Sequence, residues 1–286
     1  MSSRILIVGR GVVAQELEVQ LASPDSVLCE KGEFVVKMVS SDEFTETPKI
    51  GAAFDIVILC GSDSRAAVKL LDEVTPATKI IDISQAYRFS PGWVYGRREM
   101  GGSASVIGAT RVANPGCIAS VATLLLSPIF AKIGKPSSML YLDVTGGATI
   151  AGSTAQTERM SSLTTVHPHV REIAKACQLD EDHIWLFPKV CPSYTRGIRC
   201  AVPLPDLGLS VEDVRSIWDE AYRPNPTIHV EKFEIKSIAG NAWSGKLGAA
   251  LTVVPHASGI LAIGMIDNLL KGAVENAIYN IRDMLQ

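Results

Sequence analysis

A single cysteine placed directly after a Pro-Gly turn is the strongest chemical signal in the sequence. Residues 114–117 read Asn-Pro-Gly-Cys, and an apolar run typical of a helix follows over 118–130. A thiol at the start of a helix lies beside unpaired backbone N–H groups and the positive end of the helix dipole, which favours the thiolate. Cys117 is therefore a candidate nucleophile. The alternative is a small buried cysteine that packs like alanine.

Two histidines and two arginines are candidate partners for this thiol. His167 and His169 flank a proline before an amphipathic run, and imidazole is the side chain that titrates near neutral pH. A structural role for either histidine is the alternative, and no third ligand stands at a spacing that suits a metal. Arg196 and Arg199 lie beside a glycine, where their guanidinium groups would suit a phosphate or carboxylate unless the segment is a solvated turn.

A glycine-rich loop near the N-terminus predicts a dinucleotide site. Residues 9–14 read Gly-Arg-Gly-Val-Val-Ala, after a strand-like run over 5–8 and before a helical pattern. The first glycine permits the turn, and the second lets the backbone approach a pyrophosphate that the helix N-terminus then holds. The alternative is a tight strand–helix turn without a ligand.

The end of the second strand favours NADP(H) over NAD(H). Two hydroxyl residues, Ser40 and Ser41, stand where a ribose-binding carboxylate is expected, and they leave room for a 2′-phosphate. Lys37 and Arg10 could supply positive charge. The predicted cofactor contacts in this half of the chain are Gly9, Gly11, Val12, Val13, Ser40, Ser41, Cys60 and Gly61.

The order of apolar runs predicts an α/β protein with two domains. Strand-like runs over 5–8, 34–39, 56–59 and 79–83 alternate with helical patterns. Such alternation predicts a doubly wound parallel sheet of the Rossmann type. Later strand-like runs, over 139–144, 198–202, 227–235 and 249–254, have few helices between them and predict an α+β domain on a largely antiparallel sheet.

The expected dinucleotide-binding domain covers 1–116 plus 260–286, because a final strand over 260–266 and a helix from 268 to about 285 would return to the first sheet. The catalytic and dimerisation domain would cover 117–259. Helices are expected over 169–177 and from the N-cap Ser210 through Tyr222.

Composition excludes several classes of function. The chain of 286 residues carries a formal net charge of -3, which gives no reason to expect nucleic acid or an anionic membrane as a partner. No apolar run is long enough to span a bilayer, and the start of the chain lacks the pattern of a signal peptide. Six scattered cysteines without CxxC spacing indicate reduced thiols, so we expect a cytoplasmic protein.

Six segments, in order, resemble the N-acetyl-γ-glutamyl-phosphate reductase family, which is related to aspartate-semialdehyde dehydrogenase. The most specific is Val-Ala-Asn-Pro-Gly-Cys over 112–117, similar to the nucleophile segment of the family. The others are the segments over 82–89, 95–99, 167–173, 196–198 and 267–273. The last reads Asp-Asn-Leu-Leu-Lys-Gly-Ala, where the family has Asp-Asn-Leu-x-Lys-Gly-Ala.

This resemblance implies an NADPH-dependent reductase that converts an acyl phosphate to a semialdehyde and phosphate through a cysteine thioester, in the biosynthesis of an amino acid such as arginine. It implies a homodimer or homotetramer. Cys117 would be the nucleophile, with His167 or His169 as the acid/base residue, and Asn268 would approach the nicotinamide. The expected contacts to substrate are Arg196, Arg97, Arg98, Asn114 and Ser153.

Some positions depart from the family pattern. Ser153 stands where the family has a basic residue, and Val190 where a histidine is usual. These changes favour a related amino-acid acyl phosphate as an alternative substrate. The other functions that the sequence leaves open are an aspartate-semialdehyde dehydrogenase-like enzyme, a non-redox cysteine acyltransferase or hydrolase, and an inactive cofactor-binding regulator.

Overall fold

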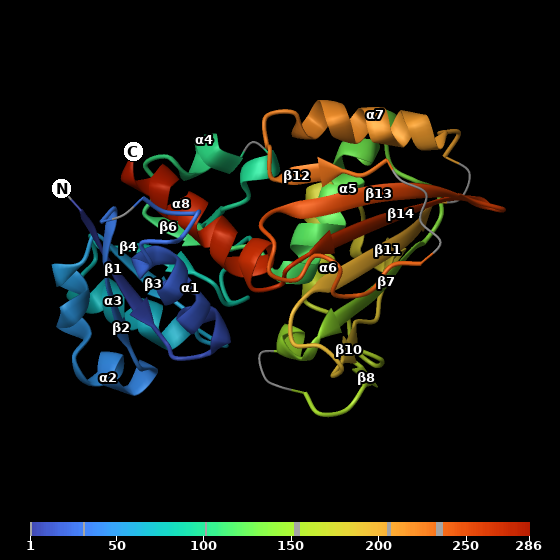
Figure 1. Ribbon diagram of the computed structural model, residues 1–286. Helices are drawn as coiled ribbons and strands as arrows, with labels where there is room; N and C mark the ends of the chain where they lie inside the picture. Colours follow the sequence, from blue (N-terminus) through green and yellow to red (C-terminus); the bar gives the residue numbers. More distant parts are fainter. Residues whose placement is uncertain (1, 31, 101, 152–154, 205–206, 233–236) are drawn as a thin grey trace. The chain divides into compact units, whose positions relative to one another are not determined.

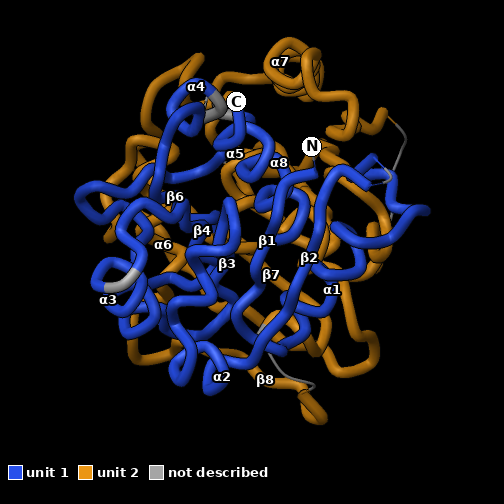
Figure 2. Tube along the Cα trace, turned by 90° about the vertical axis from the view of Figure 1, so that its left-hand side faces the viewer, with its two compact units in different colours: residues 1–115, 273–286 blue, residues 116–272 orange. Residues whose placement is uncertain are grey.

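The computed structural model describes residues 2–30, 32–100, 102–151, 155–204, 207–232 and 237–286. The chain forms two compact units, one of residues 1–115 and 273–286 and the other of residues 116–272 (Figure 2). Each unit has its own sheet and its own apolar core.

Unit 1 is built on a parallel sheet of six strands (Figure 1). The strands are β1 (Ser3–Val8), β2 (Phe34–Val39), β3 (Ile56–Leu59), β4 (Lys79–Asp82), β5 (Val94–Tyr95) and β6 (Arg111–Ala113), in the order β2-β1-β3-β4-β6-β5. All neighbouring pairs are parallel, which confirms the predicted doubly wound sheet. The central strand β3 is buried throughout, because a strand covered on both faces needs a continuous apolar run.

Helices and turns connect these strands. The α-helices are α1 (Val12–Ala22), α2 (Ser41–Glu46), α3 (Arg65–Val74), α4 (Gly102–Val106) and α8 (Glu275–Leu285), with 3-10 turns over Pro48–Ala53 and Arg98–Met100. The C-terminal helix α8 belongs to unit 1, as predicted, and packs against β4.

Unit 2 is built on a mixed sheet whose four central strands are antiparallel. Its strands are β7 (Leu140–Gly147), β8 (Arg159–Met160), β9 (Ile184–Leu186), β10 (Lys189–Cys191), β11 (Ile198–Leu204), β12 (Ile228–Val230), β13 (Ala249–His256) and β14 (Gly259–Ile266). The order is β12-β13-β14-β11-β7-β10-β8, and β9 pairs with β7. The central antiparallel strands confirm the α+β prediction, and β9, β10 and β12 add parallel pairs to it.

Three helices share an apolar core with this sheet: α5 (Cys117–Ile133), α6 (His169–Cys177) and α7 (Val211–Tyr222). Turns of 3-10 type occur over Ala148–Ala151 and Glu181–His183. Helix α5 packs against β11, β14, α6 and α7, so it forms the middle of the core. The predicted helices over 169–177 and 211–222 are confirmed, and Ser210 caps the second in a capping box with Asp213.

The predicted place of the last strand is wrong. Strand β14 was expected to return to the first sheet, but it pairs along its full length with β11 and β13 of unit 2. Only residues 273–286 return to unit 1. A strand with an apolar face towards α5 is stabilised wherever its register buries that face, and the local sequence does not choose between two sheets.

A proline inside α5 is compensated by α7. Pro128 has no N–H, so it cannot bond the carbonyl of Leu124 one turn earlier. The Tyr222 hydroxyl of α7 donates to that carbonyl at 2.7 Å, and Trp218 Nε1 donates to the next carbonyl, of Leu125, at 2.9 Å. The two buried aromatic rings therefore fasten α7 to α5.

Among the helices of the described residues, none combines the length and the apolar character that crossing a bilayer requires.

Candidate active site

Cys117 is the first residue of α5, where the sequence places it. Gly116 is the N-cap, with an extended backbone at φ -82° and ψ 152°, and its carbonyl accepts from Ser120 N–H at 2.8 Å. The apolar run after the cysteine buries α5 in the core and so fixes its first turn. Cys117 itself keeps part of its surface exposed, so it is accessible to a reactant as a nucleophile must be.

Burial makes three other cysteines of the chain poorer nucleophiles than an exposed thiol. It raises the pKa of Cys29 to about 11 and the pKa values of Cys60 and Cys200 to about 12. These thiols stay protonated at neutral pH and are poor nucleophiles. No disulfide joins any of the six cysteines, all of which lie within the described residues.

A buried carboxylate, which the sequence analysis did not identify, joins the cysteine turn to the histidines. Glu172 is 2% exposed, and its Oε2 accepts the N–H of Gly116, the residue before Cys117, at 2.9 Å. Its Oε1 lies 3.7 Å from Nε2 of His169. The spacing could have identified Glu172 as a partner of His169, since positions 169 and 172 lie on one face of the predicted helix over 169–177. Only the fold shows that this face meets the first turn of α5.

The two histidines are neighbours with different surroundings. Their rings lie 4.7 Å apart at an angle of 71°. His167 Nδ1 accepts the backbone N–H of His169 at 3.2 Å, and burial lowers the pKa of His167 below its ordinary value. His167 is therefore neutral at pH 7, with its proton on Nε2. His169 faces the buried Glu172 carboxylate, with its Nε2 3.7 Å from Glu172 Oε1.

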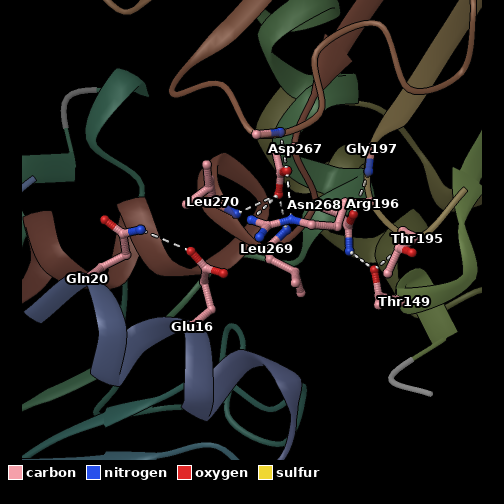
Figure 3. Close-up of polar contacts among 11 residues, drawn as sticks. Glu16, Gln20, Thr149, Thr195, Arg196, Gly197, Asp267, Asn268, Leu269 and Leu270 are labelled. Atoms are coloured by element: carbon pink, nitrogen blue, oxygen red, sulfur yellow. Dashed lines mark hydrogen bonds and ion pairs between the residues drawn. The ribbon is translucent and has the colours of Figure 1, made fainter. Parts of the chain in front are cut away.

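A second buried carboxylate organises the turn after β14 (Figure 3). Asp267 is fully buried and accepts bonds from the backbone N–H groups of Gly245, Leu269 and Leu270 at 2.7, 2.9 and 3.0 Å. Arg196 donates from Nε and Nη2 to the same carboxylate at 2.9 and 3.0 Å. Arg196, predicted to bind a carboxylate or phosphate of the substrate, therefore binds the carboxylate of Asp267 in this structure.

Asn268 connects two further loops of unit 2 (Figure 3). Its Oδ1 accepts Gly197 N–H at 2.9 Å, and its Nδ2 donates to the Thr149 hydroxyl at 3.0 Å. Thr149 in turn donates to the Thr195 carbonyl at 2.7 Å. These bonds hold the loops around Arg196 in place, and the predicted contact of Asn268 with a nicotinamide stays a prediction.

In unit 1, the predicted glycine loop is packed closely on the end of a strand. Gly9 has a φ of +125°, and a β-carbon there would lie 3.2 Å from the carbonyl oxygen of Cys60, the residue that follows β3. Gly11 is the N-cap of α1, and nothing lies within 4 Å of where its β-carbon would be. The backbone at the start of this helix is open to an anion, so these residues fit a dinucleotide.

The residues predicted for the 2′-phosphate surround a carboxylate. Ser40 and Glu43 form a capping box at the start of α2, in which each side chain bonds the backbone N–H of the other residue. Arg10 donates from Nη2 to Glu43 Oε2 at 3.0 Å. Glu43 was not among the predicted residues, although it stands three residues after Ser40, at the usual position of a capping box.

Of the remaining predicted substrate contacts, three belong to unit 1 and one lies outside the described residues. Asn114, Arg97 and Arg98 belong to unit 1. Asn114 is buried, donates to the Ala273 carbonyl at 3.1 Å and accepts from Asn280 at 3.0 Å. Arg97 is 3% exposed, and the Arg98 guanidinium lies 4.6 Å from the centre of the Tyr279 ring. Ser153 lies outside the described residues.

Comparison with known proteins identifies relatives over both units. A family model described as "Semialdehyde dehydrogenase, dimerisation domain" matches residues 117–268. The N-acetyl-gamma-glutamyl-phosphate reductase of Xanthomonas axonopodis pv. citri (strain 306) is 30% identical over 240 residues, which cover 80% of this chain and 74% of that protein. The protein of the same name from Xylella fastidiosa (strain M23) is 28% identical over 247 residues, covering 81% and 72%.

Solved structures with the same fold are aspartate semialdehyde dehydrogenases. The enzyme from Francisella tularensis matches with a TM-score of 0.72 at 12% identity, covering 99% of this chain and all of that one (100%). Aspartate semialdehyde dehydrogenase II from Vibrio cholerae, complexed with ASA, matches with a TM-score of 0.70 at 15% identity, covering 100% and 98%. These likenesses confirm the fold class.

Proposed function

Because this chain belongs to the semialdehyde dehydrogenase family that includes the N-acetyl-γ-glutamyl-phosphate reductases, we propose that it is an NADPH-dependent reductase of N-acetyl-γ-glutamyl phosphate or a related amino-acid acyl phosphate. The products are the semialdehyde and inorganic phosphate. The observation that carries the proposal is the connection from the Cys117 turn through Glu172 to His169.

In the proposed mechanism, the Cys117 thiolate attacks the acyl carbon of the substrate. The backbone N–H groups in the first turn of α5 and the helix dipole stabilise the tetrahedral oxyanion. The bond from the acyl carbon to the phosphate oxygen then breaks, inorganic phosphate leaves, and a thioester remains on Cys117.

When bound, NADPH supplies the hydride that reduces this thioester. The residues that support cofactor binding are the glycine loop and the start of α1, with Gly9 and Gly11 giving the close approach. Ser40, Ser41 and Arg10 would receive the adenosine 2′-phosphate.

His169 is the acid/base residue in this proposal, since it has the carboxylate partner. It donates a proton to the thiohemiacetal oxygen and takes the proton back as the bond from carbon to sulfur breaks, which releases the aldehyde and restores the thiolate. His167, neutral and with Nε2–H as a donor, orients the substrate oxygen. Arg196, whose carboxylate partner is Asp267, is a candidate contact for the phosphate or the substrate carboxylate.

The deciding experiment runs the reaction backwards. Reduction of NADP⁺ is followed with N-acetylglutamate γ-semialdehyde, aspartate semialdehyde and other semialdehydes, each with phosphate or arsenate. Activity with N-acetylglutamate γ-semialdehyde supports the proposal, and activity with aspartate semialdehyde alone would assign the enzyme to the alternative substrate. Cys117→Ala should lose turnover but still bind NADPH, as measured by the fluorescence of the cofactor. Hydride transfer by Cys117→Ala at the normal rate would exclude the thioester mechanism.

We also propose that the protein is a homodimer or homotetramer that acts in the cytoplasm. The support for an oligomer is the description of the matching family as a dimerisation domain. Light scattering of the purified protein tests this, and a single species with the mass of one chain would contradict it.

A further inference from the structure

Gly272 approaches the candidate nucleophile more closely than any side chain would permit. A β-carbon added to Gly272 would lie 2.6 Å from Cβ of Cys117 and 3.2 Å from its Cα. Real β-carbon contacts are not this short, so one of the two residues would have to move. The φ of Gly272 is outside the left-handed region, so glycine is required here by the lack of space and not by the backbone conformation.

The atoms in the way cannot rotate aside. Cβ and Cα of Cys117 are fixed to the main chain, whereas the end of a long side chain could change rotamer. Cys117 is the first residue of α5, and the N–H of the residue before it is held by the buried Glu172. The helix that follows runs through the core of unit 2, so the cysteine cannot retreat without disturbing that packing.

The segment that carries Gly272 is held equally firmly. Its backbone N–H donates to the Asp267 carbonyl at 3.0 Å. The carboxylate of that same aspartate receives Arg196 and three backbone N–H groups (Figure 3). Gly272 also lies in a π-helical turn, Leu270–Val274, a rare geometry that often occurs at functional sites.

We propose that Gly272 is a positioning residue for the nucleophile, which fixes Cys117 by contact and is itself fixed by the Asp267 turn. The turn acts as a rigid stop behind the cysteine Cβ and so restricts where the sulfur lies. Attack on an acyl carbon and hydride delivery both depend on that position, and a misplacement of about 1 Å lowers rates by about 100-fold. The role in catalysis rests on the proposed reductase function, whereas the contact itself does not.

Kinetics of Gly272→Ala test the role in catalysis. We expect kcat to fall by roughly 10- to 100-fold, with the NADPH dissociation constant, measured by fluorescence, unchanged. The pH profile of Cys117 alkylation by iodoacetamide, measured from pH 6 to pH 10, should also differ between Gly272→Ala and wild type. The matched control is Gly264→Ala, where the added carbon meets the ends of side chains, 2.8 Å from Val121 Cγ2 and 3.2 Å from Leu125 Cδ1. That variant should keep most of the activity and the wild-type alkylation profile.

A stability cycle tests the contact without any assay of activity. Gly272→Ala should lower the melting temperature of wild type and of Cys117→Ala alike, because alanine keeps the β-carbon at position 117. In Cys117→Gly, which lacks that carbon, Gly272→Ala should lower the melting temperature much less. If Gly272→Ala alone does not fold, recovery of folding in the Cys117→Gly background supports the proposal.

The proposal is overturned if Gly272→Ala keeps wild-type kcat, or if its loss of stability is the same with glycine and alanine at position 117. A wild-type protein without reductase activity would instead contradict the proposed function, and the stability cycle would still decide whether the contact exists.

Discussion

Glu172 Oε1 lies 3.7 Å from Nε2 of His169, three residues earlier on the same helix. Its other carboxylate oxygen is bonded to the backbone N–H that precedes Cys117. One buried carboxylate thus contacts both the first turn of α5 and the proposed acid/base residue.

Glu172→Gln should therefore lower kcat with little loss of stability. Glutamine keeps an oxygen that can accept the Gly116 N–H, but it carries no negative charge to support an imidazolium at His169. We expect a loss of about 100-fold or more, the size of a general acid–base contribution. Steady-state kinetics in the reverse direction measure it. Glu220→Gln, an exposed change on α7, is the control and should be neutral.

Stability should fall in mild acid because of His167. Burial lowers the pKa of this imidazole from the ordinary value of 6.5, so the unfolded chain takes up the proton at a higher pH than the folded protein does. The stabilisation is therefore present above pH 6.5 and is lost as the pH falls below it. Protonation of Nδ1 would also break its bond to the His169 N–H.

Urea unfolding at pH 7.5 and pH 5.5 measures this effect. The difference in unfolding free energy between the two pH values should be smaller in His167→Gln than in wild type. His256→Gln, at an exposed position at the end of β13, should leave the difference as it is. An equal pH dependence in wild type and His167→Gln would contradict the assignment.

The choice of cofactor should depend on Glu43. Hydrogen bonds from the Ser40 backbone and from Arg10 lower the pKa of Glu43 to about 2, so the carboxylate is charged in any assay. In the proposed cofactor site it would compete with the 2′-phosphate for Arg10 and would repel that phosphate. Glu43→Gln removes the charge but can still complete the capping box.

We expect Glu43→Gln to tighten NADPH binding by roughly three- to tenfold and to leave NADH binding nearly unchanged. The gain should shrink at high salt because these groups are exposed. Asp42→Asn removes a charge one residue away and should have a smaller effect. Both dissociation constants are measured by fluorescence titration. Equal changes for NADPH and NADH would show that Glu43 does not interact with the 2′-phosphate.

Local patterns predicted the elements around the site, but long-range contacts were not visible in them. The start of α5 at Cys117 and the limits of α6 follow from turn residues and apolar periodicity, and both are confirmed. The bond between Glu172 and Gly116 depends on how α6 packs on α5. Arg196 and Asp267 are 71 positions apart, so the sequence suggested a substrate contact for an arginine that has a partner within the protein.

The error over β14 has the same origin. A continuous apolar run over 260–266 suits a strand of either sheet. Its pairing with β11 and β13 places it in the sheet of unit 2. The contact of Gly272 with Cys117 was also hidden, because a glycine in a predicted helix carries no sign of what lies beside it.

Tyr222 bonds the carbonyl that Pro128 of α5 leaves without its usual donor. In a regular helix the N–H of residue 128 would bond the Leu124 carbonyl, which Tyr222 serves here instead. Tyr222→Phe should cost about 1–2 kcal/mol of unfolding free energy, because it leaves a buried carbonyl without its donor. In Pro128→Ala, the restored N–H takes over that carbonyl, so the same change at Tyr222 should cost much less.

Urea unfolding of the four proteins in this cycle measures the coupling between the two positions, which we expect to be about 1 kcal/mol. Trp218→Phe provides the matched comparison. The Trp218 indole donates to the Leu125 carbonyl, whose partner in a regular helix is the N–H of residue 129. The loss of unfolding free energy in Trp218→Phe should therefore not depend on Pro128. If Tyr222→Phe and Trp218→Phe respond alike to Pro128→Ala, α7 is held to α5 by apolar packing, and the hydroxyl of Tyr222 is not a replacement for the missing helix bond.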